Sequence, residues 1–115
     1  ERWQRALEAA RDGGFDEAAQ ARALDRARRL CVGMEILAGV ESPPDEAALR
    51  MEVQVERLHR GLAAGEADAA APAEAVRALE LEWLANGPMP AGARPDLEER
   101  FSSAREAALR EVSAA

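Results

Sequence analysis

Residues 82–101 read EWLANGPMPAGARPDLEERF, and this stretch forms the corner between two predicted helices. Pro88 and Pro90 cannot continue a helix, and each biases its predecessor toward extended geometry. Asn86-Gly87 is expected to end the first helix, because both residue types tolerate a positive φ. An aromatic residue stands on each side of the corner, so we expect the two rings to pack together. The predicted structural corner comprises Trp83, Gly87, Pro88, Pro90 and Phe101.

Apolar residues spaced by three and four predict five helices and no strand. The first covers about 1–12 and stops at the breaker pair Gly13-Gly14. The second runs from near Asp16 to about Ala38, the third to about Ala63, the fourth starts at Pro72 and the fifth at Pro95-Asp96. The predicted stripes are Leu24, Ala27, Cys31, Met34 and Ala38; then Ala48, Met51, Val55, Leu58 and Leu62; then Val76, Leu79 and Trp83; and last Leu97, Phe101, Ala104, Ala108 and Val112.

The connection GVESPPDE (39–46) carries signals for a helix end and a helix start. Gly39 is suited to the left-handed conformation that closes a helix. Ser42 is predicted to be an N-cap, followed by Pro43 in the first turn. Because the connection is short, we expect the two flanking helices to fold back as an antiparallel hairpin.

The chain is expected to be an all-α, repeat-like arrangement of antiparallel hairpins. Residues 1–13 are interpreted as the last helix of a preceding repeat, 14–63 as a hairpin, 64–71 as a flexible linker, and 72–115 as a hairpin that forms the second half of a repeat. The repeat rests on the match of ERWQRALEAARD (1–12) with ERFSSAREAALR (99–110), in which Trp3 aligns with Phe101. The chain begins at Glu1 and not Met, so we expect a piece of a longer protein.

These motifs carry a resemblance to a known family. The order of motifs resembles that of the bacterial domain-of-unknown-function family 349: a helix ending at Trp83, then Gly87-Pro88-x-Pro90, then Phe101-x-x-Ala104. LCVGMEILAGVESPPDEAALRMEVQVERL (30–58) resembles the segment before the last repeat in long proteobacterial members. The resemblance implies a helical, cytosolic, tandem-repeat protein of which this chain is a C-terminal fragment. It implies no activity and no catalytic residues.

Composition limits the partners. The 115 residues carry 22 acidic and 15 basic side chains, a net charge of -7, and every basic residue apart from His59 is an arginine. An acidic balance argues against general binding to phosphate backbones and to anionic membranes. No apolar run approaches the roughly 18 residues of a membrane-spanning helix. The single cysteine, Cys31, cannot form an internal disulfide, which agrees with a cytoplasmic location.

The best basic stripe is Arg22, Arg26 and Arg29, at helical spacing. We favour an intramolecular ion-pair face, because Asp25 and Glu35 interrupt the positive charge and no aromatic residues are interleaved. RNA or ribosome binding by this speculative stripe is the alternative. The same interpretation applies to Arg50, Arg57 and Arg60, which lie on the next helix.

We nominate no catalytic, cofactor-binding or metal-binding residue. Glu56 and His59 share a helix face, but a di-iron bundle needs a second such pair, and zinc needs more ligands than His59 and Cys31 supply. Cys31 lies on an apolar stripe and is interpreted as a small buried hydrophobe.

The sequence therefore favours a non-catalytic helical interaction or scaffold module of a bacterial cytosolic protein. A protein partner is expected, or self-association through the heptad-like stripes of the second and third helices. No small-molecule substrate or membrane is inferred, and RNA or ribosome association is the alternative.

Overall fold

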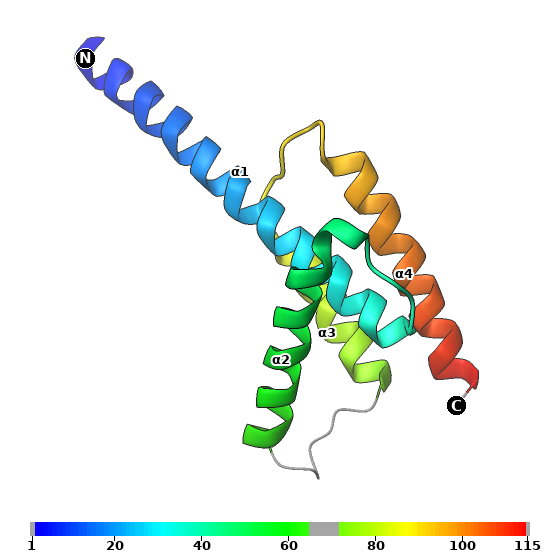
Figure 1. Cartoon of the computed structure of the whole chain (residues 1–115). Coiled ribbons are helices and arrows are strands. Elements are labelled where there is room, and N and C mark those ends of the chain that lie inside the picture. Colours follow the sequence, from blue (N-terminus) through cyan, green and yellow to red (C-terminus); the bar gives the residue numbers. More distant parts are fainter. Residues whose placement is uncertain (1, 65–71, 115) are drawn as a thin grey trace.

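The computed structural model describes the backbone of residues 2–64 and 72–114, and the side chains of 17–60 and 72–114. These residues form four α-helices, one short 3-10 helix and no strand (Figure 1). In chain order they are α1 (Arg2–Ala38), the 3-10 helix η1 (Pro44–Glu46), α2 (Ala47–Ala64), α3 (Pro72–Ala85) and α4 (Arg94–Ala114). The all-α class expected from the sequence is confirmed. The expected number of helices is wrong by one.

The difference lies at Gly13-Gly14, where the predicted break is absent and α1 continues through both glycines. Each glycine costs a helix only about 1 kcal/mol relative to alanine. Unlike proline, glycine retains its backbone N–H and can complete the helical hydrogen bonds. The surrounding residues are rich in Ala, Arg and Glu, which favour helix. The N-terminal part of α1 projects beyond the other helices (Figure 1).

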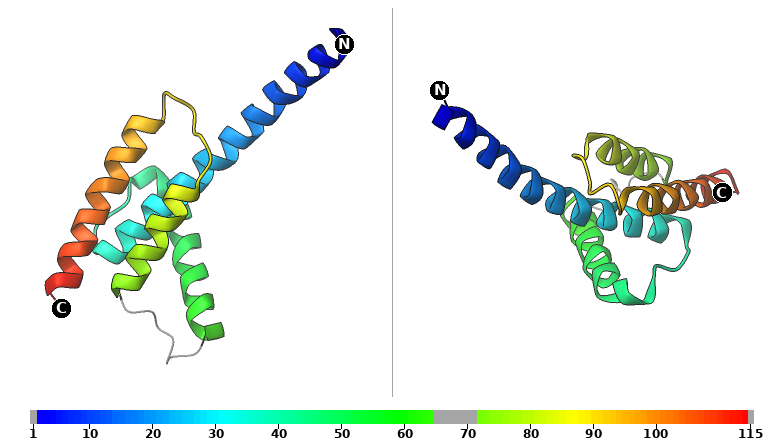
Figure 2. Two further views of the ribbon diagram at one scale, coloured as in Figure 1. Left: turned by 180° about the vertical axis from the view of Figure 1, so that it is seen from behind. Right: turned by 90° about the horizontal axis from the view of Figure 1, so that it is seen from above.

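The C-terminal half of α1 is the centre of the fold and contacts α2, α3 and α4. In Figure 2, α1 passes between α2 on one side and α3 on the other. The main core lies where α1 meets α3 and α4, and much of it is alanine, which lets helix axes approach closely. Its buried members are Ala23, Ala27, Leu30, Cys31, Met34, Ala38, Val76, Met89, Leu97, Phe101, Ala104 and Ala108. The apolar faces predicted for α1, α3 and α4 therefore point inward.

The end of α1 matches its prediction, while the start of the next helix does not. Gly39 has a φ of 70°. Its N–H donates to the Ile36 carbonyl and that of Val40 to the Glu35 carbonyl, the two bonds of a Schellman motif. Ser42 is not an N-cap, since η1 has no side-chain cap and begins after Pro43. The Ser42 hydroxyl instead donates to the Glu35 carboxylate at 2.7 Å, and a hydrogen bond to an ionised acceptor is stronger than one between neutral groups.

The stripe predicted on α2 faces away from α1. Met51, Val55 and Leu58 are exposed, with 63%, 42% and 67% of their surface accessible. Among the described side chains of α2, Val53 is the buried one, and Arg29 of α1 forms ion pairs with Glu52 and Glu56. The strongest apolar face of α2 is thus left uncovered by the described chain.

The linker predicted for 64–71 falls almost entirely on residues 65–71, which lie outside the described residues, while Ala64 belongs to α2. The side chain of Trp3 and that of Leu62 also lie outside them. None of the described helices is sufficiently long and apolar to cross a lipid bilayer.

Candidate functional site

The corner after α3 is held by an aromatic stack. The rings of Trp83 and Phe101 lie 4.2 Å apart between centroids and are inclined by only 9°. Phe101 is buried and Trp83 is half-buried. The contact expected from the sequence is therefore present, and it places both rings within the packing of α3 against α4.

The backbone of the corner differs from its prediction. Neither Asn86 nor Gly87 has a positive φ; among the described residues Gly39 alone does. α3 ends at Ala85, and the next residue, Asn86, anchors the corner to α1, since its amide Nδ2 donates to the Ala23 carbonyl at 2.9 Å. Met89, between the two prolines, is buried in the core. This anchoring role of Asn86 and Met89 is not evident from the sequence, because it depends on α1 lying beneath the loop.

The predicted arginine stripe lies on a groove between α2 and α3, floored by α1. The groove has a volume of about 380 Å³. Arg22, Arg26 and Arg29 of α1 line it together with Arg57 and Arg60 of α2. The sequence presents these as two separate stripes on two helices. The tertiary structure brings them to one place, which is the main new feature of the site.

Only part of this positive charge is neutralised. Arg29 pairs with Glu52 at 3.3 Å and with Glu56, and Arg60 lies 3.9 Å from Glu56. Within the described side chains, Arg22, Arg26 and Arg57 have no ion-pair partner. Burial lowers the pKa of Arg57, and the positive charge of Arg60 lowers it further. The ion-pair interpretation thus applies to Arg29 and Arg60, and three other cations remain available.

The groove also has an apolar floor and some negative charge. Leu30 and Gly33 of α1, Val53 of α2 and Leu79 of α3 contribute the apolar surface. The acidic lining residues are Asp25, Glu56 and Glu82. Five arginines against three carboxylates leave the lining net positive, although the chain as a whole carries -7. Such a groove can hold an apolar side chain flanked by anionic groups.

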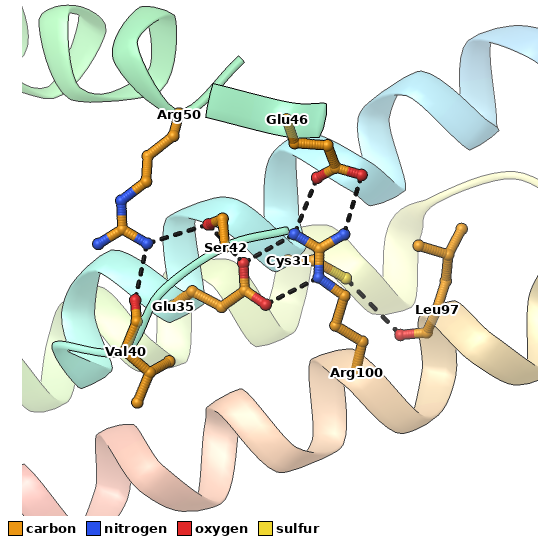
Figure 3. Close-up of polar contacts among 8 residues, drawn as sticks. All are labelled: Cys31, Glu35, Val40, Ser42, Glu46, Arg50, Leu97 and Arg100. Carbon is orange, nitrogen blue, oxygen red and sulfur yellow. Dashed lines mark hydrogen bonds and ion pairs between the residues drawn. The ribbon is translucent and has the colours of Figure 1, made fainter. Parts of the chain in front are cut away.

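A second polar cluster is buried between α1, η1 and α4 (Figure 3). Arg100 donates Nε to Glu35 Oε2 and Nη2 to Glu35 Oε1, both at 2.7 Å. It also contacts Glu46 at 2.8 and 3.1 Å. The hydrogen bonds that Arg100 donates to Glu35 raise the pKa of Arg100 above its ordinary value and outweigh the opposing effect of burial. The guanidinium thus cross-links three elements, and the Arg100 side chain is only 17% exposed.

This cluster was not found from the sequence. Glu35 was expected to interrupt the arginine stripe, but its side chain is buried and pairs with Arg100, 65 positions away. One signal was present, since Glu35 is the lone acidic residue within the apolar run 30–38, where burial needs a partner. Arg50 extends the network by donating Nη1 to the Val40 carbonyl at 2.7 Å and to Ser42 Oγ at 3.0 Å.

Cys31 lies fully buried in the core. Burial raises the pKa of its thiol to about 12. Its Sγ lies 3.6 Å from the Leu97 carbonyl oxygen, which the thiol proton can reach. The neutral, enclosed thiol is a packing group in this fold.

Glu56 and His59 do not assemble a metal centre with other described residues. Glu56 is engaged by Arg29 and Arg60, and His59 is exposed. Among the described side chains, no group of three or more His, Cys, Asp or Glu residues is placed to hold a metal ion.

Comparison of the chain with protein-family models, curated proteins and solved structures gives no match. The resemblance to family 349 therefore stays a prediction.

Proposed function

We propose that this chain is a helical protein-interaction module, acting by binding and not by catalysis, in a bacterial cytoplasmic protein. The observation that carries the proposal is the outward apolar face of α2. Met51, Val55 and Leu58 step by four and three along one side of the helix, and all three are exposed. Ala48 precedes them at the same spacing, and in the sequence Leu62 continues it. A heptad seam of this kind typically pairs with another helix.

The occupant of this face is a second copy of the chain. When two α2 helices cross antiparallel, one register places Val55 against the partner's Leu58 on both sides of the two-fold axis. In that register the flanking residue Glu52 lies beside the partner's His59, which is a favourable pair. Shifting one helix by a heptad sets Val55 against the partner's Met51 and brings the two Glu52 carboxylates together, which is repulsive. The first of these two registers is therefore self-complementary, as a two-fold interface requires.

The expected dimer is weak. α2 has 18 residues and is about 27 Å long, so one helix pair buries less than the roughly 800 Å² per partner of a standard stable interface. The chain should be a monomer when dilute and a dimer when concentrated.

Light scattering over roughly 5 to 500 µM tests this, since weak interfaces dissociate within that range. The wild type should move toward the dimer mass, and Leu58→Glu should remain monomeric throughout. Leu84→Glu is the matched control: Leu84 is also an exposed leucine, 79% accessible, but lies on α3. A wild type that stays monomeric at the highest concentration, or equal effects of the two variants, would refute pairing through α2.

We also propose, as part of the same architecture, that α1 with α2 and α3 with α4 are helical hairpins of a tandem-repeat protein related to family 349. The support is that consecutive helices pack together in each pair and that the Trp83–Phe101 stack joins α3 to α4. We expect a longer natural chain to contain further copies of the Trp, Gly-Pro-x-Pro and aromatic-x-x-Ala pattern. Each copy should fold to the same helix pair. Copies that fold differently would contradict it.

A further inference from the structure

A second surface of the chain, on the opposite side of α2 from the self-pairing face, has the features of a binding site. The five arginines of the groove come from positions 22, 26 and 29 of α1 and 57 and 60 of α2. They gather in a chain of net charge -7 that holds 15 arginines in all. A locally positive lining attracts negatively charged groups, while the acidic remainder of the molecule repels them.

We propose that this groove binds an acidic peptide segment of another protein, with one apolar side chain of that segment seated on the groove floor. The inference rests on the proposed role as an interaction module, and it adds a second partner through a surface that the α2 self-pairing does not use. The apolar seat is formed by Leu30, Val53 and Leu79.

The charges of the groove define what the peptide must offer. Arg22 and Arg26 are one helical turn apart on α1, and Arg57 stands on the α2 wall across from them. None of the three has an ion-pair partner among the described side chains. Carboxylates beside a central apolar residue can therefore meet the arginines of α1 and those of the α2 wall. Arginine pairs with a carboxylate through two parallel hydrogen bonds, which adds geometric selectivity.

The observations favour a peptide over RNA as the ligand. Among the described side chains, no aromatic residue lines the groove, so this lining lacks the stacking platforms on which unpaired bases rest. Asp25, Glu56 and Glu82 stand among the arginines and would repel a continuous phosphate backbone. The apolar floor can pack against an aliphatic side chain but not favourably against a phosphate. RNA therefore becomes the competing outcome of the test.

The probe is a short fluorescein-labelled peptide with a central leucine among Glu and Asp residues, followed by anisotropy with the full chain. Its comparators are the same peptide with Gln and Asn for the acids, the same peptide with Ser for Leu, and labelled oligouridine RNA. We expect saturable binding by the acidic leucine peptide, weakened about tenfold or more in each peptide comparator. Raising the salt concentration should weaken it further, because the charges are partly exposed.

The groove variant is Arg26→Gln with Arg57→Gln, and the matched control is Arg77→Gln with Arg110→Gln. Both remove two positive charges from the described surface, but Arg77 and Arg110 do not line the groove. We expect about a tenfold loss in the groove variant and less than about a twofold change in the control. Helical circular dichroism of both variants should match the wild type.

Three results would overturn the inference: no saturable binding of the acidic leucine peptide up to about 1 mM, equal losses in the groove and control variants, or tighter binding of RNA that the groove variant abolishes. Leu58→Glu separates this inference from the proposed self-pairing. Peptide binding that survives in this variant supports an independent groove. Failure of peptide binding alongside intact wild-type dimerisation refutes the groove ligand alone.

Discussion

Removing the charge of Arg100 should destabilise the fold more than removing any surface arginine. In Arg100→Met the aliphatic stem is kept and the guanidinium is lost. The side chains of Glu35 and Glu46 are only 7% and 16% exposed, so their carboxylates would lose their cation without gaining full hydration. Breaking one side of a buried ion pair typically costs about 3–5 kcal/mol. A domain of this size has a total stability of about 5–15 kcal/mol, so the loss is a large fraction of it.

Arg105→Met is the matched control on the same helix. Arg105 pairs with Glu80 at 3.1 Å, but the two side chains are 42% and 31% exposed. An exposed pair of this kind contributes under about 1 kcal/mol. Glu35→Gln should fall between the two at about 1.5–3 kcal/mol, since Arg100 keeps its contacts with Glu46.

Urea unfolding followed by helical circular dichroism measures these free energies, with the m-value as a check that the native and unfolded states are unchanged. The expected order of destabilisation is Arg100→Met, then Glu35→Gln, then Arg105→Met. A cost for Arg100→Met below about 1 kcal/mol, or one equal to that of Arg105→Met, would refute the buried cross-link between α1, η1 and α4.

Three further predictions follow from the packing and the backbone. Phe101→Ala should lower the free energy of unfolding by about 3–5 kcal/mol. A double-mutant cycle with Trp83→Ala should show a coupling energy of about 0.5–1.5 kcal/mol for the stack, and zero coupling would contradict the ring contact. Because the pKa of Cys31 is raised from 9.0 to about 12, the unfolded thiol ionises first as pH rises, and stability falls between pH 9 and 12. Between pH 8 and pH 10, the free energy of unfolding of the wild type should fall by about 1.4 kcal/mol more than that of Cys31→Ala, as measured by urea unfolding. Parallel pH profiles of the two proteins would show that the thiol is not buried. Gly39→Ala should cost about 1–2 kcal/mol, because a residue in the left-handed conformation then carries a Cβ. Gly92→Ala is the control: φ is not positive there and a Cβ meets no atom within 4 Å, so this change should be neutral or slightly stabilising. A neutral Gly39→Ala would refute the strained cap.

Much of the secondary structure could be predicted because its causes are local. The spacing of Ala27, Cys31 and Met34 specifies which side of α1 is apolar, and Gly39 specifies where α1 ends, whatever the rest of the chain does. Gly13-Gly14 shows the limit of this reasoning. A breaker signal is a modest free-energy cost, and continuous favourable neighbours outweigh it.

The candidate site could be predicted only in part. Arg22, Arg26 and Arg29 are visible as a stripe, but their union with Arg57 and Arg60 depends on how α2 crosses α1. Amphipathicity identifies an apolar face without stating what covers it. The stripe containing Met51, Val55 and Leu58 is therefore plain in the sequence, while its exposure is not.

The helical class, the end of α1 at Gly39 and the apolar faces of the helices follow from local features of the sequence, because they depend on propensity, capping and spacing within one or two turns. Which apolar faces meet each other, which arginines share a groove, and the pairing of Glu35 with Arg100 across 65 positions are visible only once the helices are packed. The physical reason is that burial and ion pairing depend on distances between residues remote in the chain, and those distances follow from how the helices cross.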